Sequence, residues 1–143
     1  MKSINELQDE IIEEFSDFED WMDKYSLIMD MGSSLKPIGD EYKTESNLIE
    51  GCQSRVWLQA DCSEGKIFFK GDSDALIVKG IVAMLINVLS GHSAEDILES
   101  DLYFIDRIGL KENLSPTRSN GLVSMVKQMK LYALAFKVKG NGR

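Results

Sequence analysis

Ligands for a metal ion are scarce in this chain of 143 residues, which holds one histidine and two cysteines. These three side chains are too few to complete a tetrahedral zinc site without carboxylates, and no pair has the usual ligand spacing. A glycine-rich phosphate loop and a His-Glu-x-x-His helix are also missing from the sequence. We therefore expect no metal centre and no cofactor of the protein's own. His92, which follows Gly91 at a predicted helix end, is expected to be structural or solvent-exposed.

No hydrophobic run is long enough to cross a membrane. The most apolar stretch, residues 75–89, contains Lys79 and Asn87 and is shorter than the ~20 residues that a membrane span needs. The N-terminal residues lack the apolar core of a signal peptide and are too acidic for a transit peptide. Without a secretory signal, the two cysteines are expected to be free thiols in a reducing compartment. We place the protein in the cytoplasm.

Basic side chains are in the minority, with 16 Lys and Arg against 24 Asp and Glu and a net charge of −8. This balance argues against nucleic acid or an anionic membrane as the main partner. The charge is also uneven: residues 1–50 hold 14 acidic and 4 basic side chains, whereas residues 107–143 hold 8 basic side chains and only Glu112 on the acidic side. We interpret these regions as solvated helix faces; the alternative is a docking surface for an oppositely charged protein.

What is present is the composition of one globular domain, which we assign to residues 1–143. Hydrophobic residues make up 43% and charged residues 28% of the chain, an ordinary balance for a folded domain. A chain of this length buries enough surface to hold a core without disulfides or metal. No internal repeat or linker divides it.

The first part of the chain predicts two helices. Ser3 and Glu6 have the spacing of a capping box, and apolar residues follow at helical intervals. A second helix is expected from about residue 18 to residue 35, where Pro37 and its neighbours break the pattern.

The middle of the chain predicts strands. Residues 55–62 alternate apolar and polar side chains, and residues 66–70 form a second strand after a turn at residues 63–65, so that the two make a hairpin. A weaker strand is expected within residues 44–49. Three strands make a stable sheet only if helices cover their apolar face.

The remainder predicts helices. Asp74 is expected to cap an apolar helix over residues 75–89, and Ser93 to open a short one. Ser115 and Pro116 place a cap and a first-turn proline before a long last helix. The fold class is therefore α+β: two layers, with a small antiparallel sheet of about three strands covered by helices, and helices at both chain ends.

Chemistry is expected at a cysteine. Cys62 lies near a strand end and is interpreted as a small buried hydrophobe. Cys52 lies in a polar stretch before the strongest strand, where Gln53 and Ser54 are candidate donors to a thiolate and Arg55 supplies a charge if it turns inward. A thiol with such neighbours becomes nucleophilic. A disulfide between the two would need them close together and is disfavoured in the cytosol, and a resolving-cysteine mechanism would need the same proximity.

Three sequence blocks closely resemble the SufE family, the sulfur acceptors that work with cysteine desulfurases in iron–sulfur cluster assembly. The first block is Gly51-Cys52-Gln53-Ser54-x-Val56-Trp57-Leu58. The second runs from Gly71 to Gly80 with Gly71-Asp72-Ser73-Asp74-Ala75 and Ile77-Val78-Lys79-Gly80. The third is Leu114-Ser115-Pro116-Thr117-Arg118-Ser119-Asn120-Gly121-Leu122. The resemblance covers nearly the whole chain.

The resemblance implies a sulfur carrier that docks on a SufS-like, pyridoxal-phosphate-dependent cysteine desulfurase and stimulates it. The matching nucleophile is Cys52, which would take the sulfur as a persulfide, and Arg118 matches the motif arginine that would order the site or stabilise anionic sulfur. Docking is expected to involve these residues: Gly51, Gln53, Ser54, Arg55 and Asp74. The pyridoxal phosphate belongs to the partner, and the family implies a downstream iron–sulfur scaffold and the same two-layer fold. Whether such a carrier counts as an enzyme is a matter of definition.

Other classes remain as alternatives. A binding module could activate the desulfurase with Cys52 incidental, and changing Cys52 to Ser would discriminate. An IscU-like cluster scaffold shares the expected fold but needs about three cysteines or equivalent ligands on one face, more than this chain offers. A thiol peroxidase would consume hydrogen peroxide, which we do not expect.

Overall fold

The computed structural model describes residues 2–50, 52 and 54–141. Two helices come first: α1 spans Ile4–Ser16 and α2 spans Trp21–Ser33. The predicted capping box is present, because the Ser3 hydroxyl accepts from the Glu6 backbone N–H and the Glu6 carboxylate accepts from the Ser3 N–H. The Asp20 side chain caps α2, so this helix begins later than its apolar pattern alone predicts.

A long antiparallel hairpin forms most of the sheet. Strand β1 (Val56–Ser63) pairs with β2 (Lys66–Ser73) over their full lengths. The two residues that join them, Glu64 and Gly65, have φ of 53° and 78°, as the two-residue turn of a tight hairpin requires. One face of the hairpin is apolar and turned to the core, with these side chains buried: Val56, Leu58, Ile67 and Phe69.

The third strand is not where the sequence predicts it. Residues 44–49 hold a 3-10 turn, η2 (Glu45–Asn47), and then a single bridge from Leu48 to Trp57. The third strand is instead β3 (His92–Ser93), which pairs with β2 on its other side and completes the order β1-β2-β3. The polar run from residue 44 to residue 47 has no alternating apolar side chains to bury, so it does not make a strand.

His92 is buried in β3. Its Nδ1 lies 3.3 Å from the Leu89 carbonyl oxygen and its Nε2 lies 3.0 Å from the Lys2 carbonyl oxygen. The ring therefore connects Lys2, just before α1, to Leu89, the last residue of the apolar helix expected over residues 75–89. Of the two roles expected for His92, the structural one is confirmed.

The remaining helices follow the predicted order, with these bounds: α3 Leu76–Leu89, α4 Ala94–Glu99, α5 Phe104–Arg107 and α6 Pro116–Asn141. The prediction that Asp74 caps α3 is wrong. Ala75 occupies the cap position without a side-chain hydrogen bond, and the Asp74 carboxylate instead accepts from the Arg55 backbone N–H at 3.1 Å. No helix in the described part of the chain is long and apolar enough to span a bilayer.

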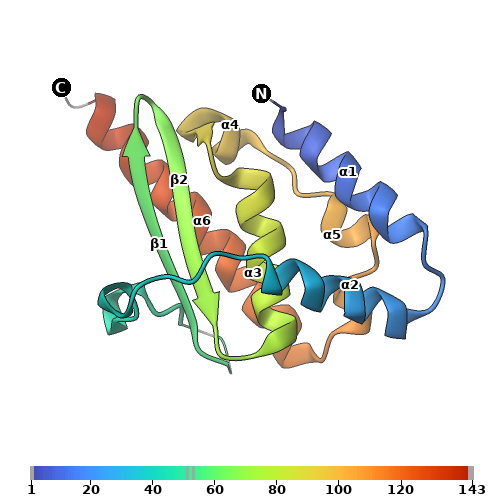
Figure 1. The fold of residues 1–143 in the computed structure, drawn as a ribbon. Helices are drawn as coiled ribbons and strands as arrows, with labels where there is room; N and C mark the ends of the chain where they lie inside the picture. The colour runs from blue at the N-terminus through green and yellow to red at the C-terminus, as the bar shows by residue number, and fades with distance from the viewer. Residues whose placement is uncertain (1, 51, 53, 142–143) are drawn as a thin grey trace.

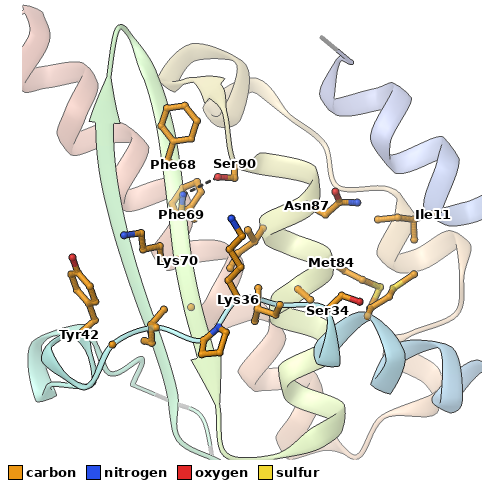
Figure 2. Close-up of a pocket in the computed structure, with 18 of the residues that line it drawn as sticks. Ile11, Ser34, Lys36, Tyr42, Phe68, Phe69, Lys70, Met84, Asn87 and Ser90 are labelled. Carbon is orange, nitrogen blue, oxygen red and sulfur yellow. Dashed lines mark hydrogen bonds between the residues drawn. The ribbon is translucent and has the colours of Figure 1, made fainter.

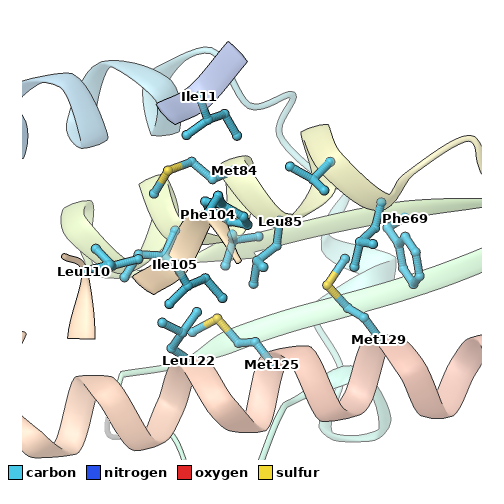
Figure 3. Close-up of a cluster of buried hydrophobic side chains, with 14 of the residues drawn as sticks. Ile11, Phe69, Met84, Leu85, Phe104, Ile105, Leu110, Leu122, Met125 and Met129 are labelled. Carbon is cyan, nitrogen blue, oxygen red and sulfur yellow. The ribbon is translucent and has the colours of Figure 1, made fainter. Parts of the chain in front are cut away.

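Helix α3 forms the centre of the core and packs against β2, α1 and α2. Figure 1 shows α6 passing behind the hairpin, while the segment after α2 crosses in front of both strands. In Figure 3, Leu122, Met125 and Met129 of α6 point toward Leu85 of α3 and Phe104 of α5. The structure confirms the α+β class, with the sheet covered by helices on its apolar face.

Candidate functional site

The connection that carries Cys52 is fixed at both ends by hydrogen bonds. On one side, the Ile49 backbone N–H donates to the Val56 carbonyl oxygen at 2.9 Å. On the other, the Arg55 N–H donates to the Asp74 carboxylate, and the Asp74 N–H donates back to the Arg55 carbonyl oxygen at 3.3 Å. Cys52 therefore lies on a short stretch between two anchored points of the hairpin base.

The thiol of Cys52 rests against the backbone of α6. Its Sγ donates a hydrogen bond to the Gly121 carbonyl oxygen at 3.7 Å, and the side chain is half-buried. A Cβ placed on Gly121 would lie 3.3 Å from that sulfur, closer than an ordinary non-bonded contact. The absence of a side chain at residue 121 is what lets the thiol sit this close to the helix.

A cavity of about 320 Å³ opens beside this thiol. It is lined by these residues: Cys52, Ser54, Val78, Thr117, Arg118, Gly121 and Met125. They come from three parts of the chain: the connection before β1, the first turn of α3 and the first three turns of α6. The fold thus brings together residues that are up to 73 positions apart in the sequence.

Burial raises the pKa of the Cys52 thiol above its ordinary value. The hydrogen bond to a carbonyl oxygen acts in the same direction, because only the protonated thiol can donate it. The sequence suggests the opposite, a thiolate with Gln53 and Ser54 as donors and with Arg55 adding charge if it turns inward. Ser54 does line the cavity, but Arg55 is exposed and does not. The geometry is that of a sheltered thiol, so attack requires movement of Cys52 or charge brought by a partner.

Arg118 is the cation of this cavity. The Ser115 hydroxyl accepts from the Arg118 backbone N–H at 3.3 Å, which places Arg118 in the first turn of α6, as Ser115 and Pro116 predict. Within the described residues, its guanidinium makes no hydrogen bond and no ion pair. The Arg118 side chain is exposed and lines the cavity. It is therefore available to an anion in the cavity.

The other predicted site residues are distributed as follows. Ser54 lines the cavity, whereas Arg55 and Asp74 are exposed and do not; the Arg55 backbone is hydrogen-bonded to both the carboxylate and the backbone N–H of Asp74. Gly51 and Gln53 lie outside the described residues. Sequence reasoning assigns no role to Val78, Thr117, Gly121 or Met125, all of which line the cavity. The spacing of three between Arg118 and Gly121 is the available signal, because it puts both on one face of a helix.

Comparison with known proteins decides the family. Residues 9–133 match the family model SufE, described as an Fe-S metabolism associated domain. The chain belongs to the SufE family. It is 43% identical over 127 residues to an uncharacterized SufE-like protein of Rhizobium etli, an alignment that covers 85% of this chain and 86% of the relative. An uncharacterized SufE-like protein of Synechocystis is 38% identical over 128 residues, covering 90% of this chain and 80% of the relative.

A plant relative and a solved structure extend the comparison. SufE-like protein 1, chloroplastic/mitochondrial, of Arabidopsis thaliana is 38% identical over 132 residues, which cover 92% of this chain and 36% of that protein. The solution structure of a hypothetical protein from Thermus thermophilus superposes with a TM-score of 0.74 at 21% identity, covering 90% of this chain and 94% of that one. This last similarity supports the fold of the SufE-family chain, and the sequence relatives support its place in iron–sulfur metabolism.

Cys62 is remote from the site. It is a free, exposed thiol in β1, so the expectation that it is a buried hydrophobe is wrong. It pairs across the sheet with Ile67 near the turn of the hairpin, about 20 Å along the strand from Val56 at the strand rise of about 3.3 Å per residue. The two cysteines are too far apart in this fold for the proximity that a resolving-cysteine mechanism needs.

A metal site and a second cavity are the other candidate features of the described residues. Among the described residues, no group of three or more His, Cys, Asp or Glu side chains could hold a metal ion. A second cavity, of about 830 Å³, lies between α1, the end of α2, β2 and α3, and neither cysteine lines it (Figure 2). Its walls are mostly apolar, with Lys36 and Lys70 among the polar residues.

Proposed function

We propose that this SufE-family protein accepts sulfane sulfur from a pyridoxal-phosphate-dependent cysteine desulfurase, as a persulfide on Cys52, and delivers it for iron–sulfur cluster assembly. One observation carries the proposal: the three sequence blocks that resemble the family meet around a single thiol. Cys52 and Ser54 come from the first block, Val78 from the second, and Arg118 and Gly121 from the third. Helix packing alone does not require this convergence on a cysteine.

The chemistry is an exchange at sulfur. The Cys52 thiolate attacks the outer sulfur of a persulfide on the donor protein, a new S–S bond forms at Cys52, and the donor's S–S bond breaks. The donor cysteine leaves as a thiolate, so the reaction moves one sulfur atom without net oxidation or reduction. No cofactor of this protein takes part, and the pyridoxal phosphate acts on the desulfurase before this step.

The geometry suits a carrier that must protect its cargo. A persulfide on an exposed loop is readily attacked by other thiols, whereas the Cys52 side chain is half-buried and has an adjoining cavity of about 320 Å³ that can take a second sulfur atom. Arg118 at the wall supplies positive charge for a persulfide anion.

The partner would dock where Cys52 emerges. Ser54 lines the cavity, Arg55 and Asp74 are exposed at the base of the hairpin that follows it, and the Leu76 side chain, two residues beyond Asp74, is 72% exposed. We include Gly51 and Gln53 in this surface because they flank the reactive cysteine in sequence. An apolar side chain ringed by polar ones is typical of a protein interface.

Desulfurase turnover tests the proposal. Alanine or sulfide production by a SufS-like desulfurase is measured with the parent protein, with Cys52→Ser and with Cys62→Ser as the matched control. We expect the parent and Cys62→Ser to stimulate turnover and Cys52→Ser to give none. Full stimulation by Cys52→Ser would favour a binding module that activates the desulfurase without accepting sulfur.

A further inference from the structure

The segment that leads into the Cys52 connection lies on the outer face of the hairpin with little packing. We call residues 39–48, between the buried side chains of Ile38 and Ile49, the strap. Figure 1 shows it crossing in front of β2 and β1. It contains η1 (Asp40–Tyr42) and η2, and neither turn has a buried residue.

Few contacts hold the strap to the sheet. The Lys70 ammonium lies 5.0 Å from the centre of the Tyr42 ring, and both side chains appear beside the strap in Figure 2. The Lys43 ammonium lies 5.5 Å from the centre of the Trp57 ring, and Leu48 bridges to the same Trp57. The two cation–π contacts each contribute about 0.5–1 kcal/mol at exposed sites. The cavity of about 830 Å³ also borders the strap at Tyr42, so the core does not support that end.

A buried carboxylate that pairs with two lysines lies beneath the strap. Asp72 of β2 is only 6% exposed, and its carboxylate lies 3.5 Å from the Lys43 ammonium and 3.4 Å from the Lys79 ammonium. It also accepts from the Ser73 N–H at 2.8 Å. A buried carboxylate needs such compensation, because an unpaired charge in this position is costly. Lys43 belongs to the strap, whereas Lys79 belongs to α3.

We propose that Asp72 is a positioning residue for the sulfur-accepting step: by holding Lys43, it holds the strap down and keeps Cys52 seated against Gly121. The inference rests on the proposed function for the sulfur-accepting step, whereas the effect of the strap on the position of Cys52 does not depend on it. The connection is direct, since the strap ends at Leu48 and is followed by Ile49, whose hydrogen bond to Val56 is the last anchor before Cys52.

Because two lysines pair with Asp72, release of Lys43 costs little free energy. When Lys43 leaves, Lys79 remains within 3.4 Å of the Asp72 carboxylate, so the buried charge is never left without a partner. The Lys43 side chain is 34% exposed in the closed arrangement, and water replaces its lost contact. The strap can therefore lift without disturbing β2 or α3.

The test measures how fast Cys52 reacts with iodoacetamide, with Cys62 of the same molecule as the internal reference. The reagent is uncharged, and peptide mass spectrometry reports the two sites separately. The variants are Asp72→Asn and Lys43→Gln, and the matched control is Asp106→Asn, an exposed aspartate of α5 that is a neighbour of neither cysteine in the sequence. We expect both strap variants to raise the Cys52-to-Cys62 ratio about threefold to tenfold, as loss of a partly buried ion pair predicts. Asp106→Asn leaves the ratio unchanged.

The two variants separate release of the strap from a simple field effect. Asp72→Asn removes a negative charge and Lys43→Gln removes a positive one, so their direct effects on the thiol have opposite signs. Only release of the strap accelerates the reaction in both.

Two results would overturn the proposal that the strap positions Cys52. Parent-like ratios in Lys43→Gln at unchanged thermal stability overturn the proposal, as does acceleration in one variant with slowing in the other. If thermal unfolding shows that Asp72→Asn is not folded, its ratio reports unfolding, because Cys62 is already exposed in the native fold and only Cys52 gains access; Lys43→Gln then decides. The assay contains no desulfurase, so a protein that accepts no sulfur but shows the strap effect refutes the proposed function alone.

Discussion

Replacing Gly121 with alanine is the most informative change to the thiol seat. The added Cβ lies 3.3 Å from Cys52 Sγ and 3.8 Å from the Cys52 Cα and Cβ. The first distance is a few tenths of an ångström shorter than a comfortable contact of about 3.5–4.0 Å. Cys52 therefore has to shift away from α6, while the helix itself is undisturbed.

The substitution Gly121→Ala has two opposing effects, one on the stability of the fold and one on the lifetime of the persulfide. Alanine in a helix interior gains roughly 0.5–1 kcal/mol over glycine, which raises the melting temperature by about 2–5 °C in a domain of this size. At the same time the added methyl group displaces the Cys52 thiol from its position against α6. A persulfide is displaced more than a thiol, because its outer sulfur lies a further ~2 Å along the side chain. We expect a loaded Gly121→Ala protein to lose its sulfur to dithiothreitol about threefold to tenfold faster, which equals roughly 0.7–1.4 kcal/mol.

The assay follows persulfide lifetime by intact mass and stability by thermal unfolding. Asn120→Ala is the matched control, since Asn120 is exposed on the same helix and its replacement gains helix propensity without a new contact to Cys52. We expect Asn120→Ala to keep the parent's persulfide lifetime. If Gly121→Ala also keeps it, the close approach of Cys52 to α6 is not what protects the sulfur, and the reasoning fails.

Three further predictions concern single side chains. Arg118→Ala should slow sulfur acceptance, with Arg118→Lys recovering part of the rate because its point charge lacks the planar fork; equal rates in stopped-flow transfer for all three proteins contradict this. Cys62→Ser should accept sulfur like the parent, because Cys62 is exposed near the far end of the hairpin, and loss of acceptance at intact fold would contradict it. Finally, burial raises the pKa of Cys52, so folding favours the protonated thiol: the stabilisation is complete below the ordinary thiol pKa and is lost as pH rises through the folded value. Alkylation of Cys52 should accordingly reach half its maximum at a higher pH in the folded protein than in the protein unfolded by urea, and coincident pH profiles would refute it.

Local patterns predict most of the elements of this fold. The Ser3–Glu6 capping box, the hairpin turn at Glu64 and Gly65, and the Ser115–Pro116 helix start each depend on neighbouring residues, and the structure has all three. The third strand is different, because β3 is only two residues long and forms through pairing with β2. A strand of that length has no alternation for a sequence pattern to detect.

The site is predictable in its nucleophile but not in its surroundings. Cys52 stands out by its polar neighbours, and of these Ser54 lines the cavity while Arg55 does not. Val78 and Gly121 also line the cavity, and they reach Cys52 only through the packing of α3 and α6. For the same reason, the raised pKa of Cys52 follows from burial that no local pattern shows. Asp74 illustrates the converse, since a residue in good position to cap α3 is drawn instead to the Arg55 backbone.

Intact-mass spectrometry tests the central claim most directly. The protein is incubated with a SufS-like cysteine desulfurase, pyridoxal phosphate and free cysteine, and its mass and the modified residue are then determined. The account predicts that the mass rises by one sulfur atom, that peptide mapping places this atom on Cys52, and that dithiothreitol removes it. An unchanged mass, or a sulfur atom found on Cys62 instead, contradicts the account.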